Sequence, residues 1–286
     1  MVTTQPTQTG RKARLEEDHP AGDHGRRRVL HWRTALVPIS LLAAILLWEL
    51  VVRLWNPPAF ILPSPGLVGT RFWQVLGDGS LLRNTLYTLS EVIVGMALGV
   101  CTATALGYVL AKSVAIERLL SPYVVASQSV PIVAIAPLLV IWFGPGMFSK
   151  VLICALIVFF PVLVNTIVGI RTVPDDLRDL MRSLQATAWQ TFHLLEVPAA
   201  LPVFLGGLRI GATLAVIGAV VGEFVGADRG LGFMINRARG QYDTALVFVA
   251  VLTLVLTALC LYGLVVLLES RLLSWQEKPD EPILSK

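Results

Sequence analysis

The stretch from Arg171 to Pro202 reads RTVPDDLRDLMRSLQATAWQTFHLLEVPAALP and separates two long apolar runs. It carries charges of both signs, and its apolar residues recur at the spacing of a helix. The sequence therefore predicts two short amphipathic helices on one face of a membrane protein. We expect these helices to form a docking surface for a soluble partner.

The first short helix is predicted from Pro174 onward. Proline suits a first helical turn, because its missing N–H would be unpaired there. Asp175 and Asp176 follow and place favourable charge beside the positive end of the helix. One apolar stripe then occupies positions i, i+3, i+4 and i+7, namely Leu177, Leu180, Met181 and Leu184.

A second short helix is predicted after Gln185, with Trp189, Phe192 and Leu195 at similar spacing. We expect Pro198 and Pro202 to disrupt regular helix before the next apolar run. Helices this short are marginal alone and need a surface that buries their apolar side chains. A layer of lipid headgroups is one such surface, but helices that lie on it usually have a strongly basic polar face. The mixed charges of this stretch favour a protein groove.

The composition is that of a polytopic membrane protein. Of the 286 residues, 55% are hydrophobic and 15% are charged, against about 25% charged in soluble domains. Apolar runs long enough for a hydrocarbon core of about 30 Å occur six times. They cover approximately residues 35–55, 84–111, 119–143, 151–170, 201–221 and 245–268. The sequence predicts an all-α membrane protein of six transmembrane helices, with the polar loop between helices four and five.

Small residues and prolines distinguish the predicted spans from one another. The second and fifth spans each carry small residues at a spacing of four, which lets another helix approach closely. These residues are Gly95, Gly99, Ala103 and Gly107 in the second span, and Gly207, Gly211, Ala215 and Ala219 in the fifth. We expect Pro131 and Pro137 to break the third span, and the fourth contains Pro161.

The distribution of Lys and Arg around the spans places both termini in the cytosol. The formal net charge of +4 is explained by these flanking residues and leaves no continuous basic face for nucleic acid. We divide the chain into a flexible cytosolic tail (1–33), a first transmembrane helix with an extracytoplasmic segment (34–81), a core domain (82–274) with the polar loop at 171–200, and a second cytosolic tail (275–286).

No catalytic or metal-binding motif is present. The chain has no Gly-x-x-x-x-Gly-Lys-Ser/Thr loop for a nucleotide, no His-Glu-x-x-His, no Gly-x-Ser-x-Gly and no Cys/His cluster at the spacing of a metal site. The three cysteines, Cys101, Cys154 and Cys260, each lie in an apolar run and are expected to be small core residues. An enzymatic role is therefore remote.

Charge inside the predicted spans is sparse. Glu91 is the one carboxylate well inside a span, and an ionisable residue at that depth is a functional candidate. The alternative is a buried carboxyl group that bonds a neighbouring helix. We also take the polar residues Gln128, Ser129 and Asn165 as candidates to line a solute pathway, with interhelical hydrogen bonding as their alternative role.

The sequence resembles the permease subunits of bacterial ABC importers of the nitrate, sulfonate and taurine type. The cytosolic loop of that family has Glu-Ala-Ala, three residues, Gly, nine residues, Ile, one residue and Leu-Pro. In this chain those positions hold Asp179, Leu180, Met181, Gln185, Leu195, Val197 and Pro198. Gln185 departs from the pattern, because Gly allows a left-handed turn that Gln resists. Residues 128–144, 159–166 and 217–232 extend the resemblance over approximately residues 82–274.

The resemblance implies a type I ABC importer permease in the bacterial inner membrane. It implies a homodimer with two cytosolic ATPase subunits, which bind ATP and Mg²⁺, and an extracytoplasmic binding protein that delivers the solute. No cofactor is expected in this chain. Solutes of the family include sulfonates, taurine, nitrate and pyrimidine or vitamin precursors. The implied ATPase-coupling residues are Leu177, Asp179, Leu180, Met181, Arg182, Leu184, Gln185, Trp189, Phe192 and Pro198.

Three other classes of function were weighed. An ion-driven secondary transporter would give Glu91 an essential role, but such proteins usually carry several intramembrane charges. A membrane-embedded enzyme lacks paired catalytic groups in this sequence. A scaffold without transport has no distinguishing sequence feature. The sparse charge favours an importer whose energy comes from another subunit.

Overall fold

The computed structural model describes residues 24–274, which are helical with short connections and contain no strand. The chain divides into two units, residues 1–56 and 57–286. In the first unit the structure describes helix α1 (His24–Trp55), in which Arg53 and Glu49 form an ion pair of 2.7 Å. Helix α1 thus begins inside the segment predicted as a tail. The remainder of that segment and the predicted tail at 275–286 lie outside the described residues.

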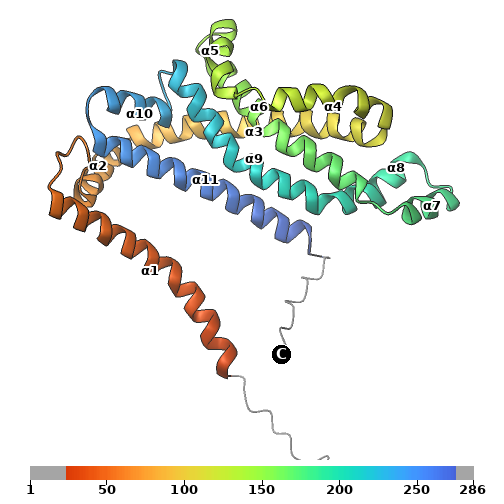
Figure 1. Ribbon diagram of the computed structural model, residues 1–286, viewed down its shortest axis with the longest axis horizontal. Coiled ribbons are helices and arrows are strands. Elements are labelled where there is room, and N and C mark those ends of the chain that lie inside the picture. The colour runs from red at the N-terminus through yellow and green to blue at the C-terminus, as the bar shows by residue number, and fades with distance from the viewer. Residues whose placement is uncertain (1–23, 275–286) are drawn as a thin grey trace, which may run out of the picture. The chain divides into compact units, whose positions relative to one another are not determined.

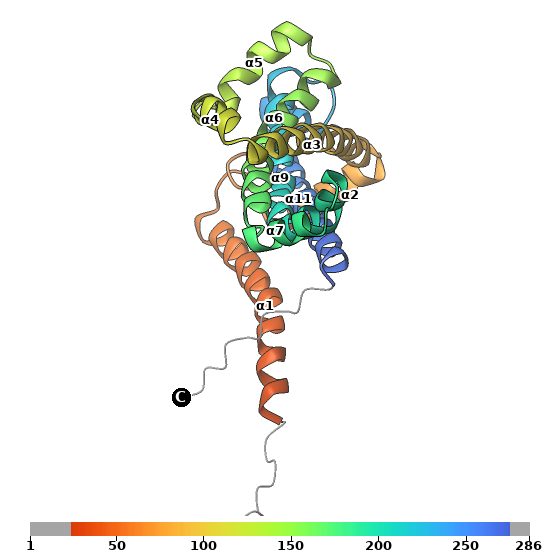
Figure 2. The same cartoon turned by 90° about the vertical axis from the view of Figure 1, so that its right-hand side faces the viewer.

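Three long helices form the core of the second unit: α3 (Ser80–Lys112), α6 (Met147–Arg171) and α9 (Val197–Gly226). Helix α6 packs along both α3 and α9, and the three run side by side in Figure 1 and Figure 2. The predicted small-residue stripes lie at these contacts. A Cβ atom added at Gly99 would lie 2.6 Å from the carbonyl oxygen of Ala155, and one at Gly207 would lie 2.6 Å from Cβ of Asn165.

Three further helices complete one end of the second unit: α2 (Pro65–Gly77), α10 (Leu231–Gly240) and α11 (Thr244–Leu272). Helix α11 packs along α9 and also contacts α10 and α2. Asp243 caps α11 by accepting from the N–H of Leu246 at 3.0 Å, and its carboxylate pairs with Arg71 of α2 at 2.7 Å. We call this end of the bundle the α10 end.

The predicted third span is two helices, α4 (Val114–Gln128) and α5 (Ile132–Phe143), which meet at 92°. The break falls at residues 129–131, because Pro131 has no N–H to continue α4. The hydroxyl groups of Ser127 and Ser129 donate to carbonyl oxygens in the last turns of α4, at 2.7 and 3.3 Å. Pro137 lies inside α5 and does not end it. Figure 2 shows α5 at one edge of the bundle, and it contacts α6 and α9 there.

The polar loop contains α7 (Asp175–Ser183), α8 (Ala188–Thr191) and a π-helical turn, η1 (Phe192–Glu196), which continues into α9. They lie at the opposite end from α10, and we call this the α7 end (Figure 1). Regular α-helix is disrupted just before Pro198, where η1 is a π-helical turn, but not at Pro202, and the helical path continues from Ala188 to Gly226. The π-helical turn accommodates Pro198, which has no N–H to give to an ordinary helical bond.

Within residues 24–274, five helical segments are long and apolar enough to cross a membrane, and six if α4 and α5 count as one bent span. The segments are α1, α3, α6, the continuous α8–η1–α9 segment and α11. The prediction of an all-α membrane protein is confirmed. The sixth span depends on the bent pair.

The close contact at Gly99 gives a direct test of the core. We expect Gly99→Ala to lower the free energy of unfolding by about 1–3 kcal/mol, because the new methyl group must displace the backbone of Ala155. Gly206→Ala is the control, since nothing lies within 4 Å of a Cβ atom at Gly206. It should raise stability by up to about 1 kcal/mol through helix propensity. Thermal unfolding of the two variants in lipid nanodiscs checks this, and equal midpoints would contradict it.

Candidate functional site

Helix α7 exposes its apolar stripe. Asp175 and Asp176 occupy its first turn and Arg182 its last, so both ends carry charge that favours the helix dipole. No residue of α7 is buried, and the side chain of Leu184 just after it is 68% exposed. A helix with such a stripe gains little stability from its own packing. The exposed stripe is therefore available to another surface.

Gln185 reverses the chain after α7. Its φ is +53°, in the left-handed region, and the surrounding bonds are those of a Schellman motif. The N–H of Ala186 donates to the carbonyl oxygen of Met181 at 2.9 Å, and the N–H of Gln185 donates to that of Arg182 at 2.9 Å. The position does need a left-handed residue, as the glycine of the family pattern implies. Here glutamine adopts that conformation at an energetic cost.

A capping box at Thr187 begins the second helical segment. The N–H of Gln190 donates to the hydroxyl oxygen of Thr187 at 3.3 Å, and the N–H of Thr187 donates to Oε1 of Gln190 at 2.8 Å. This cap was not among the predicted features. The signal is present in the sequence as Thr-x-x-Gln before an apolar run.

The root of α7 is fixed to the helices beside it. Nη2 of Arg178 donates to the carbonyl oxygen of Ile170 at 2.8 Å, at the end of α6. The guanidinium group of Arg171 donates two hydrogen bonds to the carboxylate of Glu117 in α4. Helix α7 is therefore exposed along its length but attached at its base.

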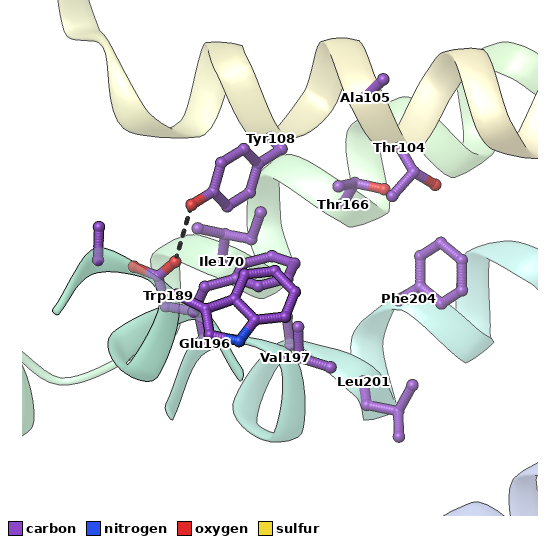
Figure 3. A pocket seen from close by; sticks show the side chains of 13 residues that line it. Thr104, Ala105, Tyr108, Thr166, Ile170, Trp189, Glu196, Val197, Leu201 and Phe204 are labelled. Atoms are coloured by element: carbon purple, nitrogen blue, oxygen red, sulfur yellow. Dashed lines mark hydrogen bonds between the residues drawn. The ribbon is translucent and has the colours of Figure 1, made fainter. Parts of the chain in front are cut away.

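Glu196 joins the second helical segment to α3. Its side chain is 2% exposed and accepts from Nζ of Lys112 and, at 3.3 Å, from the hydroxyl group of Tyr108. The Tyr108 ring also meets Phe192 edge-on, with ring centres 5.2 Å apart. Figure 3 shows the bond from Tyr108 to Glu196 and Trp189 beside it. Phe192 and Trp189 were predicted as coupling residues from the sequence. Lys112, Tyr108 and Glu196 were not, because the two residues of α3 lie far from Glu196 in the chain.

A cavity of about 730 Å³ lies beside this junction, between α3, α6 and the η1–α9 segment. Its wall is largely apolar, with Phe204 and Leu201 on one side and Thr104 and Thr166 on another (Figure 3). Trp189, whose side chain is 69% exposed, also lines it. Packing around η1 is thus looser than in the α3–α6–α9 core. This leaves the helical junction room to move.

The four candidate pathway residues lie in three different places. Gln128 and Ser129 are exposed at the break between α4 and α5. Asn165 lies between α6 and α9, where its Nδ2 donates to the carbonyl oxygen of Pro161 at 2.8 Å. Glu91 is fully buried and pairs with Lys150. The structure does not bring the four together on one surface.

The expectation that spans carry little buried charge is wrong. Helix α6 begins before the predicted span and helix α9 continues beyond its predicted end, so that Lys150 and Glu223 both lie inside helices. Both are buried, at 0% and 1% exposed. Hydropathy assigned them to connecting segments, because a charged residue near the end of an apolar run ends the predicted span.

Comparison with known proteins extends these observations. Residues 95–274 match the family described as the inner membrane component of binding-protein-dependent transport systems. The chain is 48% identical to a riboflavin transport system permease of Chloroflexus aurantiacus, over 86% of this chain and 91% of that protein. It is 36% identical to a formylaminopyrimidine transport permease of Halalkalibacterium halodurans, over 85% and 97%, and 30% identical to a taurine transport permease of Escherichia coli, over 88% and 95%.

The strained turn at Gln185 predicts that glycine has opposite effects on hydrogen exchange at positions 185 and 183. Gln185→Gly should slow hydrogen exchange at the amide of Ala186, since it removes about 1 kcal/mol of left-handed strain. Gln185→Val should speed exchange, because a β-branched residue resists positive φ. The control Ser183→Gly, inside α7, should also speed exchange, since glycine costs about 1 kcal/mol in a helix. Slower exchange in both glycine variants would contradict the assignment.

Proposed function

Because the chain belongs to the family of inner membrane components of binding-protein-dependent transport systems, we propose that its loop from α7 to η1 docks a cytosolic ATPase subunit of an ABC importer. The chain is the membrane-spanning permease of such an importer. ATP and Mg²⁺ are bound, and ATP is hydrolysed, in the separate ATPase subunit. The solute arrives on an extracytoplasmic binding protein.

The exposed apolar side chains of the loop are the observation that carries this proposal. Leu177, Leu180 and Leu184 project along α7, and Trp189 follows on α8. Asp175, Asp176 and Asp179 alternate with arginines around that stripe, which fits a protein groove better than an anionic lipid surface. Large exposed apolar residues with a polar surround are typical of a docking site.

The continuous helix gives docking a mechanical consequence. Trp189 lies on the same unbroken helical path as Gly226, at the far end of α9. A displacement of α8 by the ATPase is therefore carried along α9 toward the α10 end. The attachment of Glu196 to Lys112 and Tyr108 couples the same displacement to α3. The cavity beside η1 provides space for this movement.

We place the α7 end in the cytosol, together with both termini. Lys112, Arg118, Arg171, Arg178 and Arg182 lie at or near this end of the core helices, as expected for the cytoplasmic side. Lys150 lies in the first turn of α6, at the opposite end, where it would count as a positive residue flanking a span. Its burial beside Glu91 removes it from that count.

We propose that two copies of the chain form the translocation pathway. Helix α5 packs on α6 and α9 by one face, while Ile141 and Trp142 are 74% and 67% exposed. A second copy and the surrounding lipid would cover these side chains. The exposed break at Gln128 and Ser129 then becomes the part of α4 and α5 with polar groups available to a solute.

The solute that we propose is a heterocyclic vitamin or vitamin precursor. The support is the order of identity, which is 48% and 36% with permeases for riboflavin and formylaminopyrimidine but 32% and 30% with permeases for aliphatic sulfonates and taurine. Nitrate and sulfonates remain the other solutes of this family to compare.

Substitution of the exposed loop residues tests the docking site. Leu184→Asp and Trp189→Asp should each weaken ATPase binding by at least about 30-fold, because both side chains are exposed anchors of the proposed surface. Leu184→Met and Trp189→Phe are matched controls and should retain binding. Co-purification with the ATPase subunit and membrane insertion are both measured. Aspartate variants that co-purify at normal stoichiometry would overturn the docking assignment.

The solute class is tested on the importer's own binding protein. Thermal-shift measurements with flavins, pyrimidines, taurine, alkyl sulfonates and nitrate should give the largest stabilisation with a flavin or pyrimidine. ATPase stimulation of the reconstituted importer by the loaded binding protein then links that ligand to transport. Stabilisation by a sulfonate or nitrate alone would reject the heterocycle while leaving the importer assignment intact.

A further inference from the structure

Three ionisable side chains are fully buried together at the α10 end of the core. They are Glu91 of α3, Lys150 of α6 and Glu223 of α9, each 0–1% exposed, and we call them the carboxyl cluster. Nζ of Lys150 lies 3.5 Å from Oε1 of Glu91, and the carboxylate of Glu223 bonds the hydroxyl group of Thr88, which lies about one helical turn before Glu91 on α3. Their burial makes their total charge energetically important.

Glu223 is held as a hydrogen-bond acceptor. Its Oε1 accepts from the hydroxyl group of Thr88 at 2.6 Å, and its Oε2 accepts from the N–H of Gly232 at 2.5 Å. The oxygen of Thr88 in turn accepts from the N–H of Leu231 at 2.8 Å. These donors favour the ionised form of Glu223. They also attach the start of α10 to α3 and α9.

Glu91 differs from Glu223 in its hydrogen bonding. Neither of its carboxylate oxygens accepts a hydrogen bond from a protein group, and its contact with Nζ of Lys150 at 3.5 Å is an ion pair without hydrogen-bond geometry. Among residues 24–274, the carboxyl group buried beside Glu91 is that of Glu223, and two ionised carboxylates can only accept. A hydrogen bond between them requires a proton on one of the two. Glu223 already has donors, so Glu91 is the group that lacks one.

The charge of the cluster supports the same assignment. One ammonium group and two carboxylates leave one uncompensated negative charge in a site without solvent, which is strongly unfavourable. The other ionisable groups that face the cluster are Tyr87, whose ring lies 5.3 Å from Nζ of Lys150, and the thiol of Cys154. Neither supplies a positive charge. A metal cation would be repelled by the adjacent ammonium group, whereas a proton is not excluded in this way because it binds covalently to an oxygen.

We propose that the carboxyl cluster is a proton-binding site, in which Glu91 holds one proton and donates a hydrogen bond to the carboxylate of Glu223. The bound proton makes the cluster neutral, with Lys150 compensating Glu223. It also completes a connection between α3, α6, α9 and the start of α10. The proposal depends on the buried geometry alone and stands apart from the transport assignment.

Infrared spectroscopy of the full-length chain in lipid nanodiscs tests the site. At neutral pH the wild type should show the carbonyl stretch of one protonated carboxylic acid, with a shift in D₂O. Glu91→Gln should lose the band, because glutamine replaces the protonated group. Glu223→Gln should lose it too, since Glu91 then ionises to pair with Lys150. The control Glu117→Gln, which changes an ionised carboxylate near the α7 end, should leave the band unchanged.

Lys150→Met should strengthen the carbonyl band, whereas the two glutamine variants remove it. Without the ammonium group neither carboxylate is compensated, so the band should grow to about twice its intensity as both carboxyl groups become protonated. Should the glutamine variants fail to fold, glutamate labelled with ¹³C at its side-chain carboxyl group identifies the band in the wild type by its isotope shift. Absence of a protonated glutamate band in the wild type, or a band that persists in Glu91→Gln, would overturn the proposal. Sodium-dependent stability lost in Glu91→Gln, without any such band, would replace the proton with a cation and overturn it equally.

Discussion

The approach of α6 to its two neighbours is the contact on which the second unit is built. Gly99 admits the backbone of Ala155, and Gly207 admits the side chain of Asn165, at separations that a Cβ atom would not allow. In lipid, helices gain little from hiding apolar surface, because the solvent is itself apolar, so close packing must hold them together. That packing places Glu91, Lys150 and Glu223 on three adjoining helices. It also sets the ends of those helices, from which the loop at the α7 end projects.

Much of the fold could be predicted from the sequence, because apolar length and small-residue spacing are local properties. The stripes at Gly99 and Gly207 and the amphipathic α7 follow from such patterns. The left-handed conformation at Gln185 was indicated by a family pattern rather than by the residue itself. Glutamine disfavours that conformation, and the hydrogen bonds of the surrounding turn hold it there.

The remaining errors arose where a residue's partner is distant in the chain. Lys150 and Glu223 read as polar ends of spans, because hydropathy cannot register that each has an opposite or complementary group on another helix. Glu196 belongs to the mixed-charge stretch of the sequence, but it is buried and bonds Lys112 and Tyr108 of α3. Pro198 indicated a break in the helix. The helix instead continues through it, and a π-helical turn just before Pro198 compensates for the missing N–H. In each case the folded surroundings of the residue outweighed the preference that its local sequence indicated.

The widened turn at η1 has a geometric result. A π-helical turn contains one residue more than an α-helical turn, and one residue corresponds to about 100° of rotation about the helix axis. The residues before Phe192, including Trp189, therefore point in a direction that differs by that rotation from the one a regular helix would give them. The direction in which Trp189 points around the axis of α9 is thus set by the number of residues in the connecting turn, not by the chemistry of its side chain.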